Sequence, residues 1–192
     1  MNIRFDKINI FDMEMTCWDT PNIGHKEIIS IGICEYDCVN HTINRNKHYY
    51  VKPKKSEISS YCTDLTGITE KDVKNAPYLE DVCKQIRKTF SSSRPWGAWG
   101  NDNVFLYNQC YDLDIESPCS DEFINIGGLW TLLSGSGKSV GLKSAMEQLG
   151  MVFEGQQHNA LVDAINTAYV FQDICKMMNI RLNNSWLSCI SG

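Results

Sequence analysis

Residues 3–15, IRFDKINIFDMEM, decide the fold, because they predict the first strand of a sheet and end in two acids. Alternate side chains of a strand share a face, so Asp12 and Glu14 would leave the sheet on the same side. The apolar residues expected on that side are Ile8 and Ile10, and those on the other are Phe11, Met13 and Met15. Two acids on one face repel each other unless a cation lies between them, although a solvent-facing strand end is an ordinary alternative.

The remaining sequence predicts strands first and helices afterwards. Stretches rich in Ile, Tyr and Val indicate two more strands at 27–37 and 43–52. After Pro53 the apolar residues recur at helical spacing. The expected elements are helices at 78–91, 103–111, 139–149 and 161–178, with short strands at 95–99 and 123–126. Three strands followed by helix–strand alternation predict an α/β domain with a mixed sheet.

Composition limits the class of protein. The 192 residues carry 18 Lys+Arg against 23 Asp+Glu, a net charge of -5, and 43% are hydrophobic. These values are typical of one globular domain and argue against a non-specific binder of polyanions. The nine cysteines show no metal-ligand spacing, and no long apolar segment is present. We therefore expect a soluble protein of a reducing compartment, with a cytoplasmic location.

A second chemical signal is the segment HNALVDA, residues 158–164. His158 and Asp163 would lie roughly 140° apart if both were helical, so they could not face one site. The arrangement that works places His158 in the loop and Asp163 inside the last helix, at the edge of its apolar stripe. A loop histidine and a helix-start acid favoured by the helix dipole remain the alternative.

A third signal is Asp102, which follows the short strand at 95–99 and precedes a helix. This position predicts an N-cap as well as a metal ligand. Asp112 and Asp114 are nearby acids with a weaker context.

Together the three signals resemble the DEDDh family of 3′–5′ exonucleases, and most closely its Eri-type branch. The resemblance rests on FDMEMTCW at 11–18, EIISIG at 27–32, YCTDLTGIT at 61–69, GLKSA at 141–145 and the stretch from Gly155 through Ala168. It implies an RNase H-like fold, in which helices flank a mixed five-stranded sheet. Asn101 departs from the pattern, since many relatives carry an aromatic residue before the acid of this motif.

By this resemblance, the chain would remove nucleoside 5′-monophosphates from 3′ ends of single-stranded RNA or DNA, RNA being favoured. Two Mg²⁺ or Mn²⁺ ions would be held by four acids, Asp12, Glu14, Asp102 and Asp163. His158 would accept the proton of the attacking water, since histidine can do so near neutral pH. The residues expected to contact substrate are Met15, Thr16, Trp18, Leu65, Thr66 and Ile68.

The resemblance also implies a domain organisation. We expect an exonuclease domain over 1–182 and a C-terminal tail over 183–192, where no pattern is evident. A different reading is an oligonucleotide-binding accessory subunit that is non-catalytic or depends on a protein partner to supply substrate. The five expected active-site residues argue against a non-catalytic role.

Overall fold

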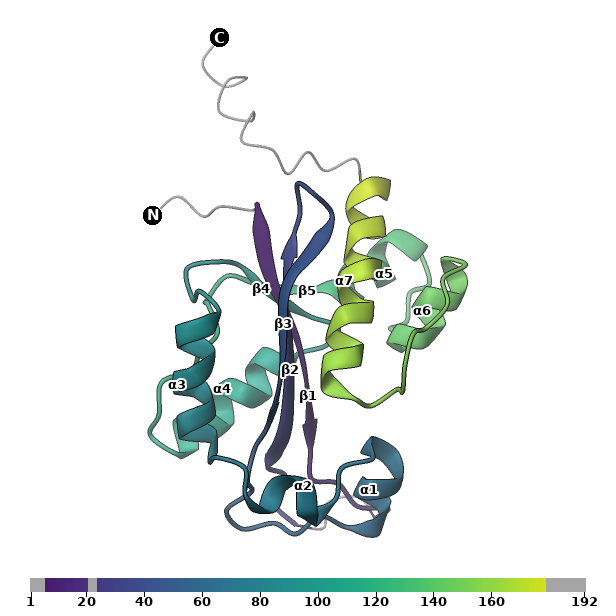
Figure 1. Ribbon diagram of the computed structural model, residues 1–192. Helices are drawn as coiled ribbons and strands as arrows, with labels where there is room; N and C mark the ends of the chain where they lie inside the picture. The colour runs from purple at the N-terminus through teal and green to yellow at the C-terminus, as the bar shows by residue number, and fades with distance from the viewer. Residues whose placement is uncertain (1–5, 21–23, 179–192) are drawn as a thin grey trace.

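The computed structural model describes residues 6–20 and 24–178, and its centre is a five-stranded sheet in the order β3-β2-β1-β4-β5 (Figure 1). Strands β1, β2 and β3 are antiparallel neighbours, whereas β1, β4 and β5 run parallel. The strands are β1 (Lys7–Met15), β2 (Ile28–Asp37), β3 (Thr42–Tyr50), β4 (Trp96–Ala98) and β5 (Phe123–Asn125). The predicted mixed five-stranded sheet is therefore confirmed.

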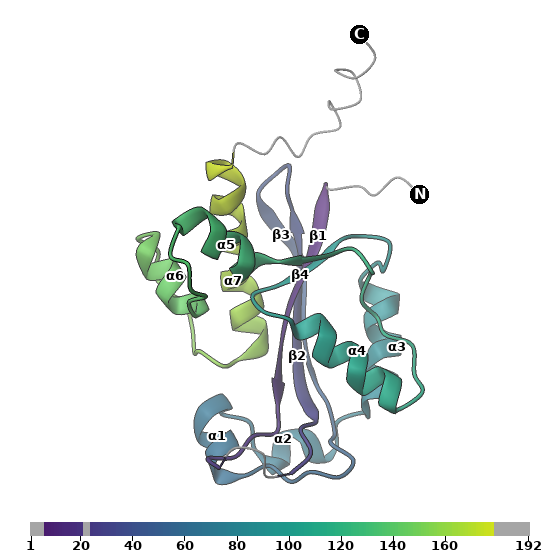
Figure 2. The ribbon, with the colours of Figure 1, turned by 180° about the vertical axis from the view of Figure 1, so that it is seen from behind.

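Helices cover both faces of the sheet, as the two opposite views show (Figures 1 and 2). Helices α3 (Leu79–Thr89) and α4 (Asp102–Asp112) lie on one face. The other face is covered by α5 (Ile126–Ser134), α6 (Leu142–Gln148) and α7 (Ala160–Met177). The short helices α1 (Ser60–Thr66) and α2 (Glu70–Lys74) lie at one end of the sheet, beyond the last residues of β1.

Alternate side chains of β1 pack into two different hydrophobic cores, one on each face of the sheet, as predicted from the sequence. Ile8 and Ile10 belong to the cluster formed with α5, α6 and α7. Phe11 and Met13 belong to the cluster formed with α3 and α4. Because Asp12 and Glu14 share the parity of the isoleucines, the strand directs them toward the α7 side.

A close approach between β2 and α7 fixes where that helix begins. Gly32 pairs with Asp12 across the sheet. A Cβ atom on Gly32 would lie only 2.1 Å from the backbone nitrogen of Leu161 and 2.2 Å from the carbonyl carbon of Ala160. Only glycine fits there, and its lack of a side chain lets the first turn of α7 reach the sheet beside Asp12.

Most predicted elements are confirmed within a few residues, but three helices were missed: α1, α2 and α5. The strand expected at 123–126 ends one residue early, because Ile126 already begins α5 and the Asn125 side chain accepts a hydrogen bond from the Gly128 N–H. The helix expected at 139–149 is shorter, since Gly141 is its N-cap. The residues expected to form the tail, and the domain boundary at 182, lie outside the described part of the chain.

Two further observations concern the cysteines and the hydrophobicity of the helices. The eight cysteines of the described residues are all free, and six of them are buried. Within residues 6–20 and 24–178, no helix combines the length and the apolar character that crossing a membrane requires.

Candidate active site

The acids at the end of β1 open into a pocket of about 380 Å³. Asp12, Glu14 and Asp163 line this pocket together with His158. Asp102 is not among the lining residues, yet its charge is the strongest of those that raise the pKa of Asp12. The structure thus brings the five residues of the predicted site together from β1, α4, α7 and the loop before α7.

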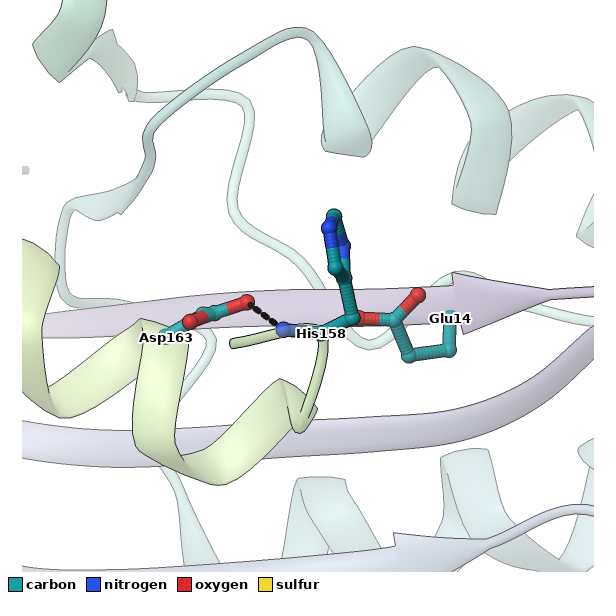
Figure 3. A group of neighbouring side chains, drawn as sticks. All are labelled: Glu14, His158 and Asp163. Carbon is teal, nitrogen blue, oxygen red and sulfur yellow. Dashed lines mark hydrogen bonds between the residues drawn. The ribbon is translucent and has the colours of Figure 1, made fainter. Parts of the chain in front are cut away.

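His158 lies in a loop and Asp163 in the first turn of α7, as the spacing predicted. The His158 backbone N–H donates a 3.0 Å hydrogen bond to Oδ2 of Asp163, drawn as the dashed line in Figure 3. His158 has a left-handed φ of 61°, which is costly for a residue with a side chain. The Asp163 carboxylate therefore stabilises the strained backbone of His158. The imidazole ring takes no part in this hydrogen bond.

Asn166 fixes the loop that carries His158 onto α7. Its side-chain nitrogen donates to the carbonyls of Glu154 and Val162, at 3.0 and 2.9 Å. Its side-chain oxygen accepts from the Glu154 N–H at 3.3 Å. Asn166 is buried, and its three bonds tie the backbone on both sides of this loop to α7.

Asp102 differs from its prediction in one respect. The N-cap of α4 is Asn101, which makes no side-chain capping bond, and Asp102 is the first helical residue. Asn101 instead accepts a hydrogen bond from the Asn125 side chain at 2.8 Å. Burial raises the pKa of Asp102, while the backbone N–H groups of Asp102 itself and of Gly100 oppose the shift, and the charge of Asp102 in turn raises the pKa of Asp12.

Burial raises the pKa values of the acids in this site, and for Asp12 and Glu14 the neighbouring acids raise them further. Burial, followed by the charges of Asp102, Glu14 and Asp163, holds the pKa of Asp12 well above its ordinary range. Burial, followed by Asp163 and Asp102, raises the pKa of Glu14 to about 8. Burial also raises the pKa of Asp163 to about 6, although the His158 backbone bond opposes the shift. These shifts mean that the ionised form of each acid is destabilised in the folded chain.

These residues fit a divalent cation. One ligand atom from each of Glu14, His158 and Asp163 lies within 4.8 Å of the others (Figure 3). Oδ1 of Asp163 is buried without a hydrogen-bond partner, a costly state for a carboxylate oxygen. Hard cations prefer carboxylate oxygens, and a bound cation would remove both the repulsion and the unpaired atom.

None of the six residues predicted to contact substrate is among those that line the pocket of the acids. Thr66 and Ile68 are buried, and the Thr66 hydroxyl binds the Cys62 carbonyl within its own helix. Thr16 is also buried and accepts a hydrogen bond from the Glu27 N–H. Met15, Trp18 and Leu65 are partly exposed. Contact of the six with a nucleotide stays a prediction, and burial does not favour it for Thr16, Thr66 and Ile68.

The turn after α1 lies close to the loop of His158. A Cβ atom on Gly67, whose φ is 75°, would lie 3.1 Å from the side-chain nitrogen of Gln156. Residues 65–68 therefore lie beside the loop that carries His158, although their side chains do not line the pocket.

Among the residues that line or shape the site, Lys143 and Gly32 were not predicted from the sequence. Lys143, in the first turn of α6, lines the pocket and forms no ion pair with any acid of the described residues. Its segment, GLKSA, belongs to the resemblance, but the lysine itself gave no separate signal. Gly32 lies in the matched segment EIISIG, and only the packing of α7 explains why a glycine is needed there.

Four acids and a histidine, gathered at the end of the central strand of a mixed sheet, define a site suited to metal-assisted hydrolysis. Comparison with known proteins supports the same class of chemistry. The RNase_T family model, whose description is "Exonuclease", matches residues 10–171. The chain belongs to this exonuclease family.

Individual relatives place the chain in the Eri-type branch. ERI1 exoribonuclease 2 of Danio rerio is 28% identical over 88% of this chain and 35% of its own length. The 3′-5′ exoribonuclease 1 of Rattus norvegicus is 28% identical over 98% of this chain and 60% of its own length. The chain therefore spans between about a third and three-fifths of these relatives.

A solved structure gives the same result for the fold. The nuclease domain of 3′hExo, a DEDDh family member bound to rAMP, has a TM-score of 0.81 and 25% identity. The match covers 93% of this chain and 96% of that domain. The RNase H-like fold and the DEDDh resemblance are both confirmed, and dependence on divalent metal ions is a property of this family.

Proposed function

We propose that the chain is a 3′–5′ exonuclease that releases nucleoside 5′-monophosphates from 3′ ends of single-stranded nucleic acid, with RNA preferred to DNA. The observation that carries the proposal is that Asp12, Glu14 and Asp163 line one pocket with His158, while none of the three acids pairs with a Lys or Arg of the described residues. The relatives named as exoribonucleases support the direction of cleavage and the choice of RNA. Recognition of the 2′-hydroxyl would distinguish the two substrates.

The acids would hold two Mg²⁺ or Mn²⁺ ions. Asp12 would contact both ions, Glu14 and Asp163 would hold one, and Asp102 would serve the other. When bound, such ions would stabilise the negative charge that develops on the attacking and leaving oxygens of the phosphodiester. The unpaired Oδ1 of Asp163 and the raised pKa of Glu14 support this assignment.

His158 would accept the proton of the attacking water. Its backbone is held by Asp163, while its side chain is exposed at the pocket. A base in this position can reach water at the scissile phosphate without being part of the buried core.

Lys143 would bind a phosphate of the substrate, because it lines the same pocket and pairs with no acid in the described part of the chain. Leu65, Met15 and Trp18 would contact the terminal nucleotide from the neighbouring α1 segment and the end of β1. Thr16, Thr66 and Ile68 would support that surface from below, as their burial suggests.

A time course on matched single-stranded RNA, single-stranded DNA and duplex oligonucleotides tests the proposal. With Mg²⁺ or Mn²⁺ we expect mononucleotides to appear from the 3′ end of RNA first, and no cleavage in EDTA. Blocking the 3′-hydroxyl should stop the reaction. Internal cleavage, or equal rates with and without metal, would contradict the proposal.

The role of His158 has its own test. His158→Ala should lower kcat by about 10²–10⁴, the usual contribution of a positioned base, with a smaller effect on KM. His25→Ala is the matched control, because His25 is exposed, lies outside the pocket and should leave kcat unchanged. Equal loss in both variants would remove His158 from its assigned role.

The second candidate, an accessory subunit that needs a protein partner, is distinguished by the same assay. It would bind short oligonucleotides without releasing mononucleotides unless that partner is added. The cytoplasmic location is likewise a proposal, for which localisation of a tagged chain is the test.

A further inference from the structure

Helix α4 carries an apolar outer face that the fold does not use. Its inner side, Leu106 and Cys110, is buried in the core. Val104, Tyr107 and Tyr111 are 48%, 58% and 75% exposed. At 100° per residue these three side chains lie within about 60° of one another, so they form one stripe. Contiguous exposed apolar surface of this kind often marks an interaction site.

The two tyrosines of the stripe are already arranged for contact. Their rings are stacked, with centroids 6.4 Å apart and planes inclined by 20°. A stacked pair loses little further freedom on binding, and exposed tyrosine is enriched at protein interfaces. The helix contains no Lys or Arg, so no basic side chain covers the stripe from within α4.

A groove of about 940 Å³ lies beside this stripe. It runs between α4, the loop before β4 and the loop before β5, and Val104 and Tyr107 line it. Its charged lining residues are all acidic: Glu116, Asp121 and Glu122. Arg87 lies 3.7 Å from Glu116, whereas Asp121 and Glu122 pair with no cation of the described residues. The groove shares no lining residue with the pocket of the acids at β1.

We propose that this surface, called here the α4 groove and formed by Val104, Tyr107, Tyr111, Glu116, Asp121 and Glu122, docks a segment of a partner protein that combines apolar and basic side chains. The apolar residues would pack on the tyrosine stripe, and Lys or Arg would meet the acids. The acidic lining would repel a phosphate backbone, so nucleic acid is not the expected occupant. The groove lies on the helix that begins at Asp102, so a docked partner would be held next to the catalytic end of the chain.

The test uses a peptide of about four helical turns with Leu and Trp on one face and Arg along one edge of that same face, where it can reach the acids beside the stripe. Fluorescence anisotropy with the full chain and saturating Mg²⁺ should show binding. Tyr107→Ala combined with Tyr111→Ala should weaken it at least tenfold. Tyr61→Ala, which removes an exposed tyrosine from α1, is the matched control and should leave the affinity unchanged.

The charge requirement is tested separately. Asp121→Asn combined with Glu122→Gln should weaken binding several-fold at low salt and less at high salt, since exposed charges are screened. A peptide with Glu in place of Arg should not bind. Nuclease activity and the melting temperature should be unchanged in all these variants, because none of the residues belongs to the core or to the acid site.

Three results would overturn the inference. Equal peptide affinity in the wild type and the double tyrosine variant would mean that the contact is only non-specific attraction to an acidic protein. Loss of oligonucleotide affinity in that variant would make the surface a nucleic-acid site. Self-association that disappears in the variant, measured by sedimentation, would make the occupant a second copy of this chain.

Discussion

Two sets of acids lie on or beside β1 and β2, and their surroundings differ. Glu27 accepts the backbone N–H groups of Lys54, Lys55 and Ser56, at 2.8, 2.8 and 2.6 Å. Burial alone would raise its pKa, but these donors outweigh burial and lower it. Asp12 and Glu14, by contrast, face other acids and have raised pKa values.

Glu35 is compensated by charge, since three cations, Lys7, Arg45 and Arg94, surround it, although its Oε1 accepts no hydrogen bond. The fold therefore provides hydrogen-bond donors or cations for the acids that serve structure, whereas the acids at the end of β1 pair with no cation of the described residues. An uncompensated acid cluster destabilises a protein unless a ligand compensates it, which is why such clusters mark functional sites. Neutralising an acid of the first set should therefore destabilise the metal-free protein, whereas neutralising an acid at the end of β1 should stabilise it.

The largest expected effect is on catalysis. Asp12→Asn removes the central charge of the uncompensated set, so kcat should fall by at least about 10³-fold. The metal-free protein should be at least as stable as the wild type, because repulsion among the acids is reduced. Nuclease rates and thermal unfolding in EDTA measure the two effects. Retained activity would exclude Asp12 from the site.

Gly32→Ala should also lower activity, by about 10²-fold, because the new Cβ would push the first turn of α7 away from Asp12. Gly32→Ala should retain the circular dichroism of the wild type, so that the loss of activity reflects the position of α7 and not unfolding. Full activity of Gly32→Ala would mean that the approach of α7 does not position Asp163.

Glu27→Gln tests the compensated set. The amide cannot accept all three backbone bonds, so the free energy of unfolding at pH 7 should fall by about 1–3 kcal/mol, with kcat of the folded enzyme unchanged. Since the folded pKa of Glu27 lies below its ordinary 4.5, its stabilisation exists above that value and is lost as pH falls through the folded pKa. Urea unfolding of both proteins at pH 7 and pH 3 should show the difference shrinking.

Glu14→Gln should raise the free energy of unfolding of the metal-free protein, where Glu27→Gln lowers it, and this is the smallest of the expected effects. The pKa of Glu14 rises from 4.5 to about 8 on folding, so the folded chain binds more protons and stability falls as pH rises through this interval. In EDTA at pH 8 the variant should be more stable by at least about 1 kcal/mol, or about 2–4 °C in Tm. The gain should vanish near pH 4.5. A constant difference across this range would show that Glu14 is not strained by its neighbours.

The sequence predicted those parts that depend on local patterns. Alternation in residues 8–15 correctly separated the two cores and directed Asp12 toward α7. The angle between His158 and Asp163 correctly placed one in the loop and the other in the helix. Both follow from the geometry of a strand and a helix, without knowledge of what packs against them.

What the sequence could not predict depends on contacts between distant segments. Helix α5 begins with Ile126-Gly127-Gly128, and the low helix propensity of glycine argues against a helix at this position in the sequence. Helices α1 and α2 span 7 and 5 residues, too short for a periodic stripe. The role of Asn101 depends on Asn125, 24 residues away, and the need for Gly32 depends on α7.

The central claim is that the uncompensated acids form a site for divalent cations. Isothermal titration with Mn²⁺ tests it most directly, because binding must release the protons that the raised pKa values retain near pH 7. The wild type and Glu27→Gln should both bind two ions with proton release, seen as a heat that depends on the buffer, whereas Asp12→Asn should lose this binding. Equal Mn²⁺ binding by Asp12→Asn, or none by the wild type, would contradict the account.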